Sequence, residues 1–586
     1  MRARLSRLIW VVWVVAWSTA AGATTEPRDI FVAAEKAAKA GDTVTYRSLS
    51  AQLRGYALYP YLEYADIDRQ LRSVDARRVR TFLEEYADTP LAALLRRDWL
   101  DVLAGQQRWG ELLGFYHPTS NTRLHCHQLN ALLQLGKREQ ALAEVEPIWL
   151  HGESQPDACD PVFDAWRKAG RLNHTLVWQR IELAMSAGEV GLARYLERYL
   201  DPADRVWAQR WRALHDDPHR ALRQADFADA HPYREHMLAH AVRRLARRDA
   251  VAALKLWQTI ARRYPFDADQ AYDTERQIVF RLIREPDDDV YAFVRSVAPR
   301  AEDVRLHEAR LRAALYRGDW ERLGEWIAQL PKDERGSDQW RYWLARSLAA
   351  RGQTAQAAAV YEALAAERSF YAFLAADHID APYRLDHRDT PVAGYWDDLE
   401  LRFPVRHADA VAAYAKRHAL DPAWVFAVVR QESAFMDDAR SHAGARGLMQ
   451  LMPATARTVA RKAYGRKPPR PWELYDAGLN ISLGTAYLRM VLNQLGDHTV
   501  LATAAYNAGP RRVRSWLPEH ALDADVWIEL VPFSETRGYL TRVLAYQVIY
   551  ENRLGRTPSR LSERLRPISS QTTRTADTRA DRQNAS

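Results

Sequence analysis

YWLARSLAARGQTAQAAAVYEALAAERSFYAFLA, residues 342–375, shows how most of this chain is built. Its apolar residues recur mainly at intervals of three and four on either side of a break at Arg351-Gly352-Gln353. They are Leu344, Leu348, Ala355, Ala358, Ala359, Tyr361, Leu364 and Ala365. This spacing predicts amphipathic helices, and glycine followed by a polar residue can end one helix and start the next. The stretch therefore predicts a pair of packed helices.

Similar breaks recur through the preceding 300 or so residues without a fixed repeat length. They are Ala40-Gly41-Asp42, Leu135-Gly136-Lys137, Ala187-Gly188-Glu189 and Arg317-Gly318-Asp319. Stacked helix pairs form a solenoid, so we predict an irregular α-superhelix. Aromatic residues at helical spacing, such as Trp340 and Trp343, are expected in its core rather than on a sugar-stacking surface.

The composition is that of a globular protein large enough for several domains. The chain has 586 residues, of which 47% are hydrophobic and 27% charged; at roughly 150 residues per domain this predicts about four domain-sized units. Its 83 Lys and Arg against 75 Asp and Glu give a formal net charge of +8. This mild excess favours anionic partners without indicating nucleic-acid binding.

The first 23 residues are predicted to be a secretory signal peptide. Arg2, Arg4 and Arg7 precede an apolar core at 8–17, and small residues close the segment at 21–23. The alternative is an uncleaved N-terminal anchor, but the apolar core is about half of the ~20 residues that span a bilayer. No cysteine follows the cleavage point to carry a lipid. We therefore expect an exported protein with no stable membrane span.

The chain has two cysteines, Cys126 and Cys159. In an oxidising compartment, two lone cysteines in one region most simply form a disulfide. The alternative is two buried free thiols. Their spacing excludes a CxxC metal or redox site, so we expect a structural role.

Proline and glycine interrupt the helical periodicity from Pro382 onward. We divide the mature chain into an α-superhelical domain at 24–337, a small helical linker domain at 338–403 and a compact domain at 404–561. The remaining Ser/Thr/Arg-rich tail, 562–586, has too few apolar residues to fold and is predicted to be disordered. The predicted fold class is mainly α.

Glu432 is the candidate catalytic residue of the compact domain. Asp421-Pro422 predicts the start of a helix, and Glu432 shares one face of that helix with three valines, Val425, Val428 and Val429. Burial and the nearby helix C-terminus should raise the pKa of this carboxyl, as a general acid requires. The alternative is a buried glutamate held by a structural hydrogen bond.

The compact domain contains four short motifs, the first of which includes Glu432. They are Gln431-Glu432-Ser433-Ala434-Phe435, Gly444-Ala445-Arg446-Gly447-Leu448-Met449-Gln450, Ala505-Tyr506-Asn507-Ala508-Gly509 and Glu535-Thr536-Arg537-Gly538-Tyr539. In order and spacing they resemble the signature motifs of the soluble lytic murein transglycosylases. More loosely, 55–61 and the solenoid resemble the ring domain of the large periplasmic members. The resemblance implies a lysozyme-like catalytic domain, a helical linker and an α-superhelical ring.

The resemblance also implies roles for individual residues. Glu432 would be the single catalytic acid and base, and Ser433 would help to orient the sugar or the acid. The other implied substrate-binding residues are Gln450, Met452, Tyr506, Asn507, Glu535 and Tyr539. His442 and Arg511 depart from common family residues, and Arg511 puts the subsite preference in doubt.

Most glycosidases use two carboxylates, whereas Asp437 and Asp438 lie in a polar stretch after the helix and are expected to face solvent. The family implies a single acid and base that forms a 1,6-anhydromuramoyl product between N-acetylmuramic acid and N-acetylglucosamine. The alternatives are a hydrolytic muramidase and a peptidoglycan-binding scaffold of cell-wall synthases.

No cofactor or metal is expected, because no cluster has metal-ligand spacing and no phosphate-binding loop occurs. The expected partners are peptidoglycan glycan strands, with cell-wall synthases as further candidates and no nucleic acid. We expect a monomer in the periplasm.

Overall fold

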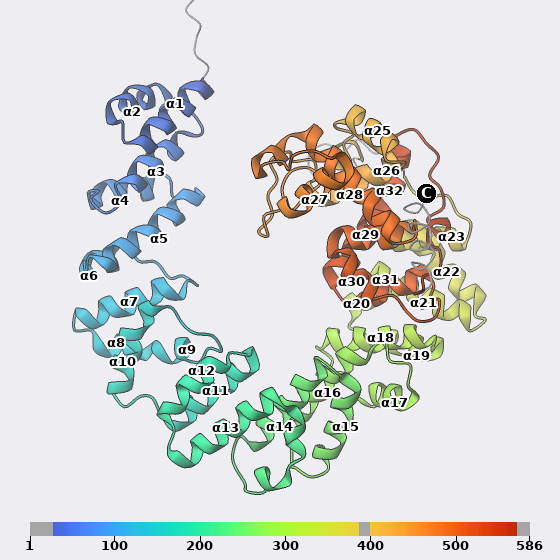
Figure 1. The fold of residues 1–586 in the computed structure, drawn as a ribbon, viewed down its shortest axis with the longest axis horizontal. Coiled ribbons are helices and arrows are strands. Elements are labelled where there is room, and N and C mark those ends of the chain that lie inside the picture. The colour runs from blue at the N-terminus through green and yellow to red at the C-terminus, as the bar shows by residue number, and fades with distance from the viewer. Residues whose placement is uncertain (1–26, 386–398, 571–586) are drawn as a thin grey trace, which may run out of the picture. The chain divides into compact units, whose positions relative to one another are not determined.

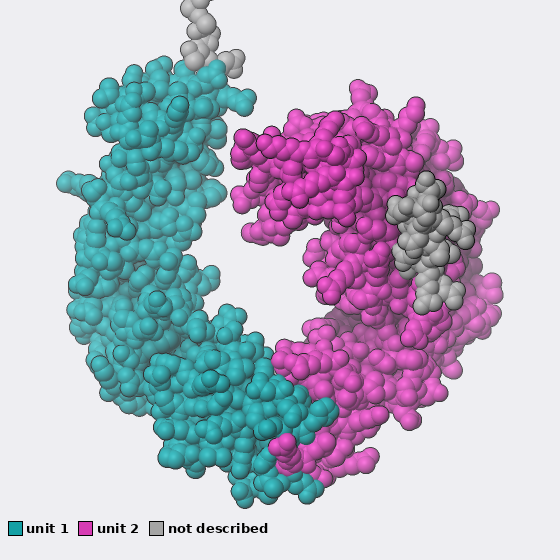
Figure 2. Space-filling model, in the orientation of Figure 1, with its two compact units in different colours: residues 1–220, 224–240 teal, residues 221–223, 241–586 magenta. Residues whose placement is uncertain are grey.

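The computed structural model describes residues 27–385 and 399–570, and the regular secondary structure in these ranges is helical (Figure 1). The chain divides into two compact units (Figure 2). Unit 1 comprises residues 1–220 and 224–240, and unit 2 comprises 221–223 and 241–586. The mainly α fold class is confirmed, whereas the ring-like closure and the domain boundaries at 337 and 403 stay predictions.

Unit 1 is a succession of short helices packed against their neighbours in the chain. Its helices are α1 (Pro27–Ala40), α2 (Thr43–Ser50), α3 (Tyr59–Arg69), α4 (Ala76–Glu85), α5 (Pro90–Gly105), α6 (Trp109–Phe115), α7 (Thr122–Gln134), α8 (Arg138–Ala143), α9 (Val145–Trp149), α10 (Asp160–Lys168), α11 (His174–Ala187), α12 (Val190–Leu196) and α13 (Pro202–Asp216). Its 3-10 helices include η1 (Ala51–Leu53), η2 (Asp157–Cys159), η3 (Glu197–Tyr199) and η5 (Gln224–Phe227). Helix α14 (Arg234–Ala246) and the 3-10 helix η4 (Pro218–Leu222) cross the boundary between the units.

The predicted breaks are helix ends. Asp42 caps α2, because its side chain accepts a hydrogen bond from the Thr45 backbone N–H at 3.1 Å. Gly188 ends α11 in the left-handed conformation. In unit 2, Asp319 caps the helix that follows Gly318 in the same way. The helices on either side of these breaks also pack against each other, so the predicted pairing is confirmed.

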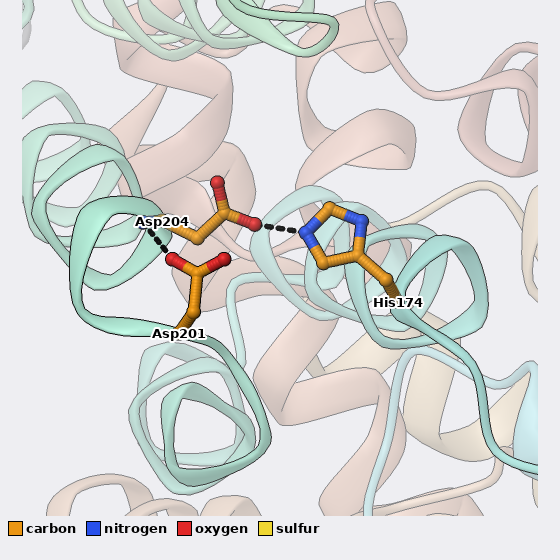
Figure 3. Close-up of side chains that lie close together, drawn as sticks. All are labelled: His174, Asp201 and Asp204. Atoms are coloured by element: carbon orange, nitrogen blue, oxygen red, sulfur yellow. Dashed lines mark hydrogen bonds and ion pairs between the residues drawn. The ribbon is translucent and has the colours of Figure 1, made fainter.

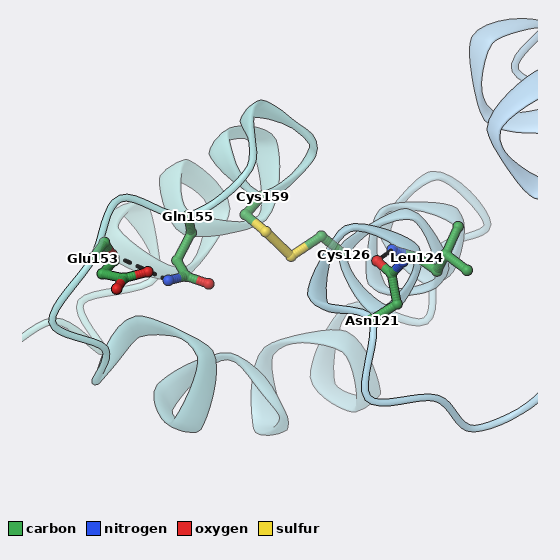
Figure 4. The surroundings of a disulfide bond; sticks show 6 residues. All are labelled: Asn121, Leu124, Cys126, Glu153, Gln155 and Cys159. Atoms are coloured by element: carbon green, nitrogen blue, oxygen red, sulfur yellow. Dashed lines mark hydrogen bonds between the residues drawn. A yellow bond between two sulfur atoms is a disulfide. The ribbon is translucent and has the colours of Figure 1, made fainter. Parts of the chain in front are cut away.

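A disulfide joins Cys126 on α7 to Cys159 in η2 (Figure 4). Both cysteines are fully buried, and no free cysteine occurs in the described part of the chain. The expected pairing is confirmed. The bond anchors the irregular segment between α9 and α10 to α7.

Unit 2 continues the helical succession and ends in a more compact bundle (Figure 1). Its helices are α15 (Ala250–Ala261), α16 (Ala268–Leu282), α17 (Asp288–Ser296), α18 (Val304–Arg317), α19 (Trp320–Ala328), α20 (Lys332–Arg335), α21 (Asp338–Ala350), α22 (Thr354–Ala365), α23 (Phe370–His378), α24 (Leu399–Arg402), α25 (Ala408–Arg417), α26 (Pro422–Ser433), α27 (Pro453–Tyr464), α28 (Ala477–Gln494), α29 (Thr499–Ala508), α30 (Pro510–Ser515), α31 (Ala524–Leu530) and α32 (Ser534–Arg553), with 3-10 helices η6 (Pro471–Tyr475) and η7 (Ser562–Arg564). Trp340 and Trp343 are fully buried on α21, as predicted.

The bundle is organised around α26 and α32, which pack against each other. Phe426 on α26 stacks on Tyr550 on α32, with ring centroids 5.2 Å apart. Helix α29 packs against α32 and also against α28. This packing brings the C-terminus of α26 to the N-terminal half of α32.

Helix α31 carries a buried carboxylate that ties the bundle to earlier helices of unit 2. Glu529 is 1% exposed, and its carboxylate lies 3.0 Å from Arg312 Nε on α18. Gln339 on α21 and Tyr371 on α23 also donate hydrogen bonds to it, at 2.8 and 3.0 Å. A buried charge needs a counterion and hydrogen-bond donors, so α18, α21 and α23 together position α31.

A second buried carboxylate on α31 repeats this arrangement. Asp525 accepts a hydrogen bond from the Tyr342 hydroxyl at 2.7 Å and forms an ion pair with Arg346, both on α21. Arg346 also pairs with Asp523 at 3.1 Å. The start of α31 is therefore anchored on α21 by charge as well as by packing.

The prediction of a disordered tail from residue 562 is wrong for residues 562–570. Leu522 and Ile568 exchange two backbone hydrogen bonds of 2.9 and 2.8 Å, and Ile568 is fully buried. The segment has few apolar residues, but it folds because it adds to a core that already exists. Residues 571–586 and the predicted signal peptide lie outside the described residues.

Within 27–385 and 399–570, the structure contains no helix long and apolar enough to cross a membrane.

Candidate active site

Glu432 lies in the last turn of α26, as the sequence predicted. The side chain of Asp421 caps the helix by accepting a hydrogen bond from the Ala423 backbone N–H at 2.9 Å, and Pro422 occupies the first turn. Val425 and Val428 are fully buried. The apolar face of α26 thus sets the rotation of the helix and directs Glu432 toward α32.

The Glu432 carboxyl accepts a hydrogen bond from the Tyr539 hydroxyl on α32, at 2.8 Å from Oε1. The pKa of Glu432 is raised to about 7, because burial and the negative charge of Glu535 raise it more than the Tyr539 hydrogen bond lowers it. A carboxyl with this pKa holds a proton on about half of the molecules at neutral pH. It can therefore donate a proton and take one back.

The turn that follows Glu432 has an unusual backbone. Ala434 and Phe435 both have positive φ angles, 50° and 66°, which non-glycine residues rarely adopt. The Ser433 hydroxyl donates to the Val429 carbonyl at 3.3 Å and accepts from the Phe435 backbone N–H at 3.1 Å. Ser433 thus stabilises the strained turn through hydrogen bonds to the backbone.

The loop from Gly447 to Gln450 approaches α28 closely. A Cβ atom on Gly447 would lie 2.2 Å from the Leu474 carbonyl oxygen and 2.4 Å from Asn480 Nδ2, and its φ is +73°. Asn480, which is fully buried, also fixes this loop through hydrogen bonds. It accepts one from the Met449 backbone N–H at 2.8 Å and donates one to the Arg446 carbonyl at 2.9 Å. Only glycine fits at position 447.

Gln450 and Met452 lie at the end of this loop. Gln450 has a φ of 45°, and its Nε2 donates to the carbonyls of Ala439 and Gly447 at 3.0 and 2.8 Å. These bonds orient the amide and leave its oxygen available as an acceptor. The Met452 side chain is 40% exposed.

Tyr506 and Asn507, at the end of α29, join the loop to the start of α32. The Tyr506 hydroxyl donates to the Met449 carbonyl at 2.9 Å. Asn507 donates to Glu535 at 3.3 Å and accepts from the Thr536 hydroxyl at 2.7 Å. Burial and the neighbouring Glu432 carboxylate hold the pKa of Tyr506 well above its usual value, so its hydroxyl stays protonated.

The structure joins Tyr539 to Glu432 by a hydrogen bond, and Glu535 and Tyr506 lie close enough to interact with its charge. Asn507 contacts Glu535. Gln450 and Met452 lie at the end of the loop that Tyr506 holds. Sequence reasoning missed Asn480, Gly484 and Thr536. A Cβ on Gly484 would lie 2.3 Å from Met449 Sδ. For Asn480 and Gly484 the sequence did offer a signal, because each interrupts the otherwise apolar helix α28.

The remaining acidic and variable residues near the motifs make other contacts. Asp437 pairs with His407 at 3.1 Å and Asp438 is exposed. His442 and Arg511 are both exposed. Of the carboxylates near Glu432, the one that affects its pKa is Glu535.

One cluster in unit 1 has the composition of a metal site. His174, Asp201 and Asp204 bring potential ligand atoms within 4.8 Å of one another (Figure 3). However, Asp201 caps α13 by accepting from the Asp204 backbone N–H at 2.9 Å. Asp204 accepts hydrogen bonds from His174 and, at 2.8 Å, from Trp178 Nε1. These bonds explain the cluster as a helix-capping network, and we assign no metal to it.

Comparisons with known proteins agree with this geometry. The chain is 32% identical over 580 residues to the soluble lytic murein transglycosylase of Escherichia coli K12, covering 87% of this chain and 90% of that protein. A solved structure of the lytic transglycosylase Slt of Pseudomonas aeruginosa, an inactive Glu-to-Gln variant, matches with a TM-score of 0.80 and 33% identity, covering 91% and 98% of the two chains. The 70 kDa soluble lytic transglycosylase of E. coli matches with a TM-score of 0.79 and 29% identity, covering 91% and 97%.

Two family models also match. The transglycosylase SLT domain matches residues 409–524, which include α26 to α30. The soluble lytic transglycosylase helical domain matches residues 530–559, around α32. The E. coli relative covers 87% of this chain at 32% identity. The chain therefore belongs to the soluble lytic murein transglycosylase family.

Proposed function

We propose that this enzyme cleaves the β-1,4 bond between N-acetylmuramic acid and N-acetylglucosamine in peptidoglycan without water, as a lytic transglycosylase. The observation that carries the mechanism is the Tyr539–Glu432 hydrogen bond at a carboxyl whose pKa is about 7. Such a carboxyl is stable in both protonation states that the reaction needs.

In the first step, protonated Glu432 transfers its proton to the bridging oxygen as the bond from that oxygen to the muramoyl anomeric carbon breaks. The Tyr539 hydroxyl stabilises the carboxylate that remains. In the second step, this carboxylate takes the proton of the muramoyl 6-hydroxyl, whose oxygen bonds to the anomeric carbon. The product is a 1,6-anhydro sugar, and Glu432 is protonated again.

The nucleophile belongs to the substrate, so its effective concentration is already high. A second protein carboxylate is then unnecessary. Gln450 Oε1, the exposed thioether of Met452 and the Asn507–Glu535 pair are proposed to contact the glycan. Tyr506 is proposed to line the same subsites while holding the loop, and Ser433 to position Glu432 through its turn.

A hydrolytic muramidase remains the competing function, because Glu535 is close enough to influence the pKa of Glu432. In that case Glu535 would activate water. Its exposure and its hydrogen bond to Asn507 favour a substrate-binding role instead. Mass spectrometry of products from purified glycan strands separates the two: anhydro ends support the transglycosylase, and reducing ends support the muramidase. No cleavage would support a binding scaffold.

Glu432→Gln tests the assignment of the acid. The P. aeruginosa relative is described as inactive with the same type of replacement. We expect more than the ~10²- to 10⁴-fold loss typical of a lone general acid, because one residue serves both proton steps. Asp438→Asn is the matched control on an exposed acid. Substantial residual cleavage by Glu432→Gln would show that another group donates the proton.

The remaining proposals concern the setting of the enzyme. The predicted signal peptide supports export to the periplasm, where peptidoglycan strands are the partner. Cell-wall synthases are candidate protein partners, and we propose a monomer. We retain 24–337, 338–403 and 404–561 as proposed superhelical, linker and catalytic domains.

A further inference from the structure

Unit 1 contains a cavity of about 510 Å³ that the catalytic site does not use. Its walls come from α9, η2, α10, α11, α12 and η3, and include Trp149, Phe163, Tyr195 and Tyr199. Gln155, which Figure 4 shows beside the disulfide, lies at its edge. A cavity of this size with aromatic walls is typical of a small-ligand site.

Arg180 on α11 lines this cavity and is 4% exposed. Its guanidinium lies 4.1 Å from the centroid of the Trp149 ring and 5.4 Å from that of Phe163. Its Nε has no hydrogen-bond partner, and its guanidinium forms no ion pair or hydrogen bond with any residue that the structure describes. Burial lowers the pKa of Arg180 only to about 10, so the group is a cation at neutral pH.

Arg310 and Arg312, the other buried arginines among the described residues, each have a hydrogen-bond acceptor, although Arg310 Nε, like Arg180 Nε, has none. Arg310 also lies over a tryptophan, 4.1 Å from the Trp326 ring, but it donates to the Arg295 carbonyl at 3.2 Å. Arg312 pairs with Glu529. Because an uncompensated buried charge destabilises a fold, the state of Arg180 points to an anionic ligand that supplies the missing partner.

The rest of the cavity supplies the groups that bind a sugar. The Tyr195 side chain is 46% exposed, and its ring lies 6.1 Å from that of Tyr199. Aromatic faces such as these pack against the apolar faces of hexose rings. Asp157 and Asp160 are exposed at the rim and can accept hydrogen bonds from hydroxyl and amide groups. The second cavity arginine, Arg167, is already paired with Asp164 at 3.0 Å.

We propose that this cavity binds an acidic amino sugar, with the carboxylate of its substituent paired to Arg180 and its ring against Tyr195 and Tyr199. The lactyl carboxylate of a muramoyl residue has this chemistry, so the cavity is a second glycan-binding site on unit 1. Identifying peptidoglycan as the source of the sugar rests on the proposed function. The proposal that Arg180 binds a carboxylate does not depend on that function.

The test is a ligand-observed NMR titration of the full-length chain with N-acetylmuramic acid. N-acetylglucosamine, which lacks the lactyl carboxylate, is the matched ligand. The variants are Arg180→Met, Arg180→Lys and, as the control, Arg194→Met, which removes an exposed arginine on α12 outside the cavity lining.

We expect Arg180→Met to weaken the affinity for N-acetylmuramic acid about tenfold to 100-fold, the usual effect of losing a hydrogen-bonded charge. Arg180→Lys should retain part of the affinity, and Arg194→Met all of it. N-acetylglucosamine binding should not depend on Arg180. Arg180→Met should also melt no lower than wild type, since it removes an uncompensated buried charge.

Equal affinity of wild type and Arg180→Met for N-acetylmuramic acid would overturn the proposal. An equal loss for both sugars would overturn it as well. If Arg180→Met misfolds, Tyr195→Ala, at a side chain already 46% exposed, should weaken binding, and unchanged affinity would count against the site. Cleavage of short soluble glycan chains, measured on the same proteins, should survive in Arg180→Met. Absence of cleavage in wild type would refute the proposed function and leave the binding result standing.

Discussion

Replacing Arg312 with methionine should destabilise unit 2 by about 3 kcal/mol. Arg312 Nε lies 3.0 Å from the Glu529 carboxylate, and both side chains are more than nine-tenths buried. Removing one partner of a buried ion pair costs roughly 3–5 kcal/mol, because the remaining charge stays buried without its counterion. We expect the lower end of this range, since Gln339 and Tyr371 continue to donate hydrogen bonds to Glu529.

Thermal unfolding of the full chain, followed by calorimetry, measures this loss. An unfolding entropy of about 2.1 cal/mol/K per residue over the roughly 350 residues of unit 2 makes 3 kcal/mol equal to a fall in Tm of about 4 °C. Adding Glu529→Gln removes the stranded charge and should recover at least about half of that fall. Arg322→Met is the control, because its partner Glu325 is exposed and such pairs contribute at most about 1 kcal/mol.

The same variant should also lose turnover. Helix α31 runs directly into α32, which carries Glu535 and Tyr539, so a loosened α31 weakens the positioning of Tyr539 against Glu432. A Tm within about 1 °C of wild type for Arg312→Met would refute this reasoning. So would a double variant that is no more stable than the single one.

Three further changes test the site and unit 1. Tyr539→Phe removes the hydrogen bond that lowers the pKa of Glu432, so this pKa should rise above about 7. The alkaline limb of the rate-pH profile should then move to higher pH, and kcat should fall. An unmoved alkaline limb would contradict the assignment. Gly447→Ala should cost more than about 2 kcal/mol by denaturant titration, because of the positive φ and the backbone clash, and full activity with wild-type stability would count against the role of this loop. Reducing the Cys126–Cys159 bond should lower the stability of unit 1 by about 3 kcal/mol without changing cleavage of short soluble chains, whereas an unchanged melting profile would show that the bond contributes little.

Local sequence patterns were sufficient for much of the fold and for the identity of the acid. Apolar residues at three- and four-residue intervals and glycine-polar breaks predicted helix pairs, because helix periodicity and capping depend on neighbours within one or two turns. The same applies to Glu432, whose burial follows from the valines on its own helix face. The disulfide also followed from composition, since only one pairing of Cys126 and Cys159 is possible.

Contacts between segments far apart in the chain could not be predicted from such patterns. The sequence predicted that residues 562–586 would not fold, yet Ile568 pairs with Leu522 because a bundle formed elsewhere offers it an apolar site. Asn480 was not predicted as a site residue, and its role is visible only through its hydrogen bond with the Met449 backbone.

By itself, then, the sequence determined the helical class, the positions of most breaks and the candidate acid, because each of these depends on residues close together in the chain. Tertiary structure alone decided what surrounds that acid. The Tyr539–Glu432 hydrogen bond joins residues 107 positions apart, and the Arg312–Glu529 pair joins residues 217 positions apart. The proposed role of Arg180 likewise depends on a cavity that several helices enclose. Such contacts depend on how helices pack against one another, and the periodicity of a single helix specifies only which face is buried, not which partner covers it.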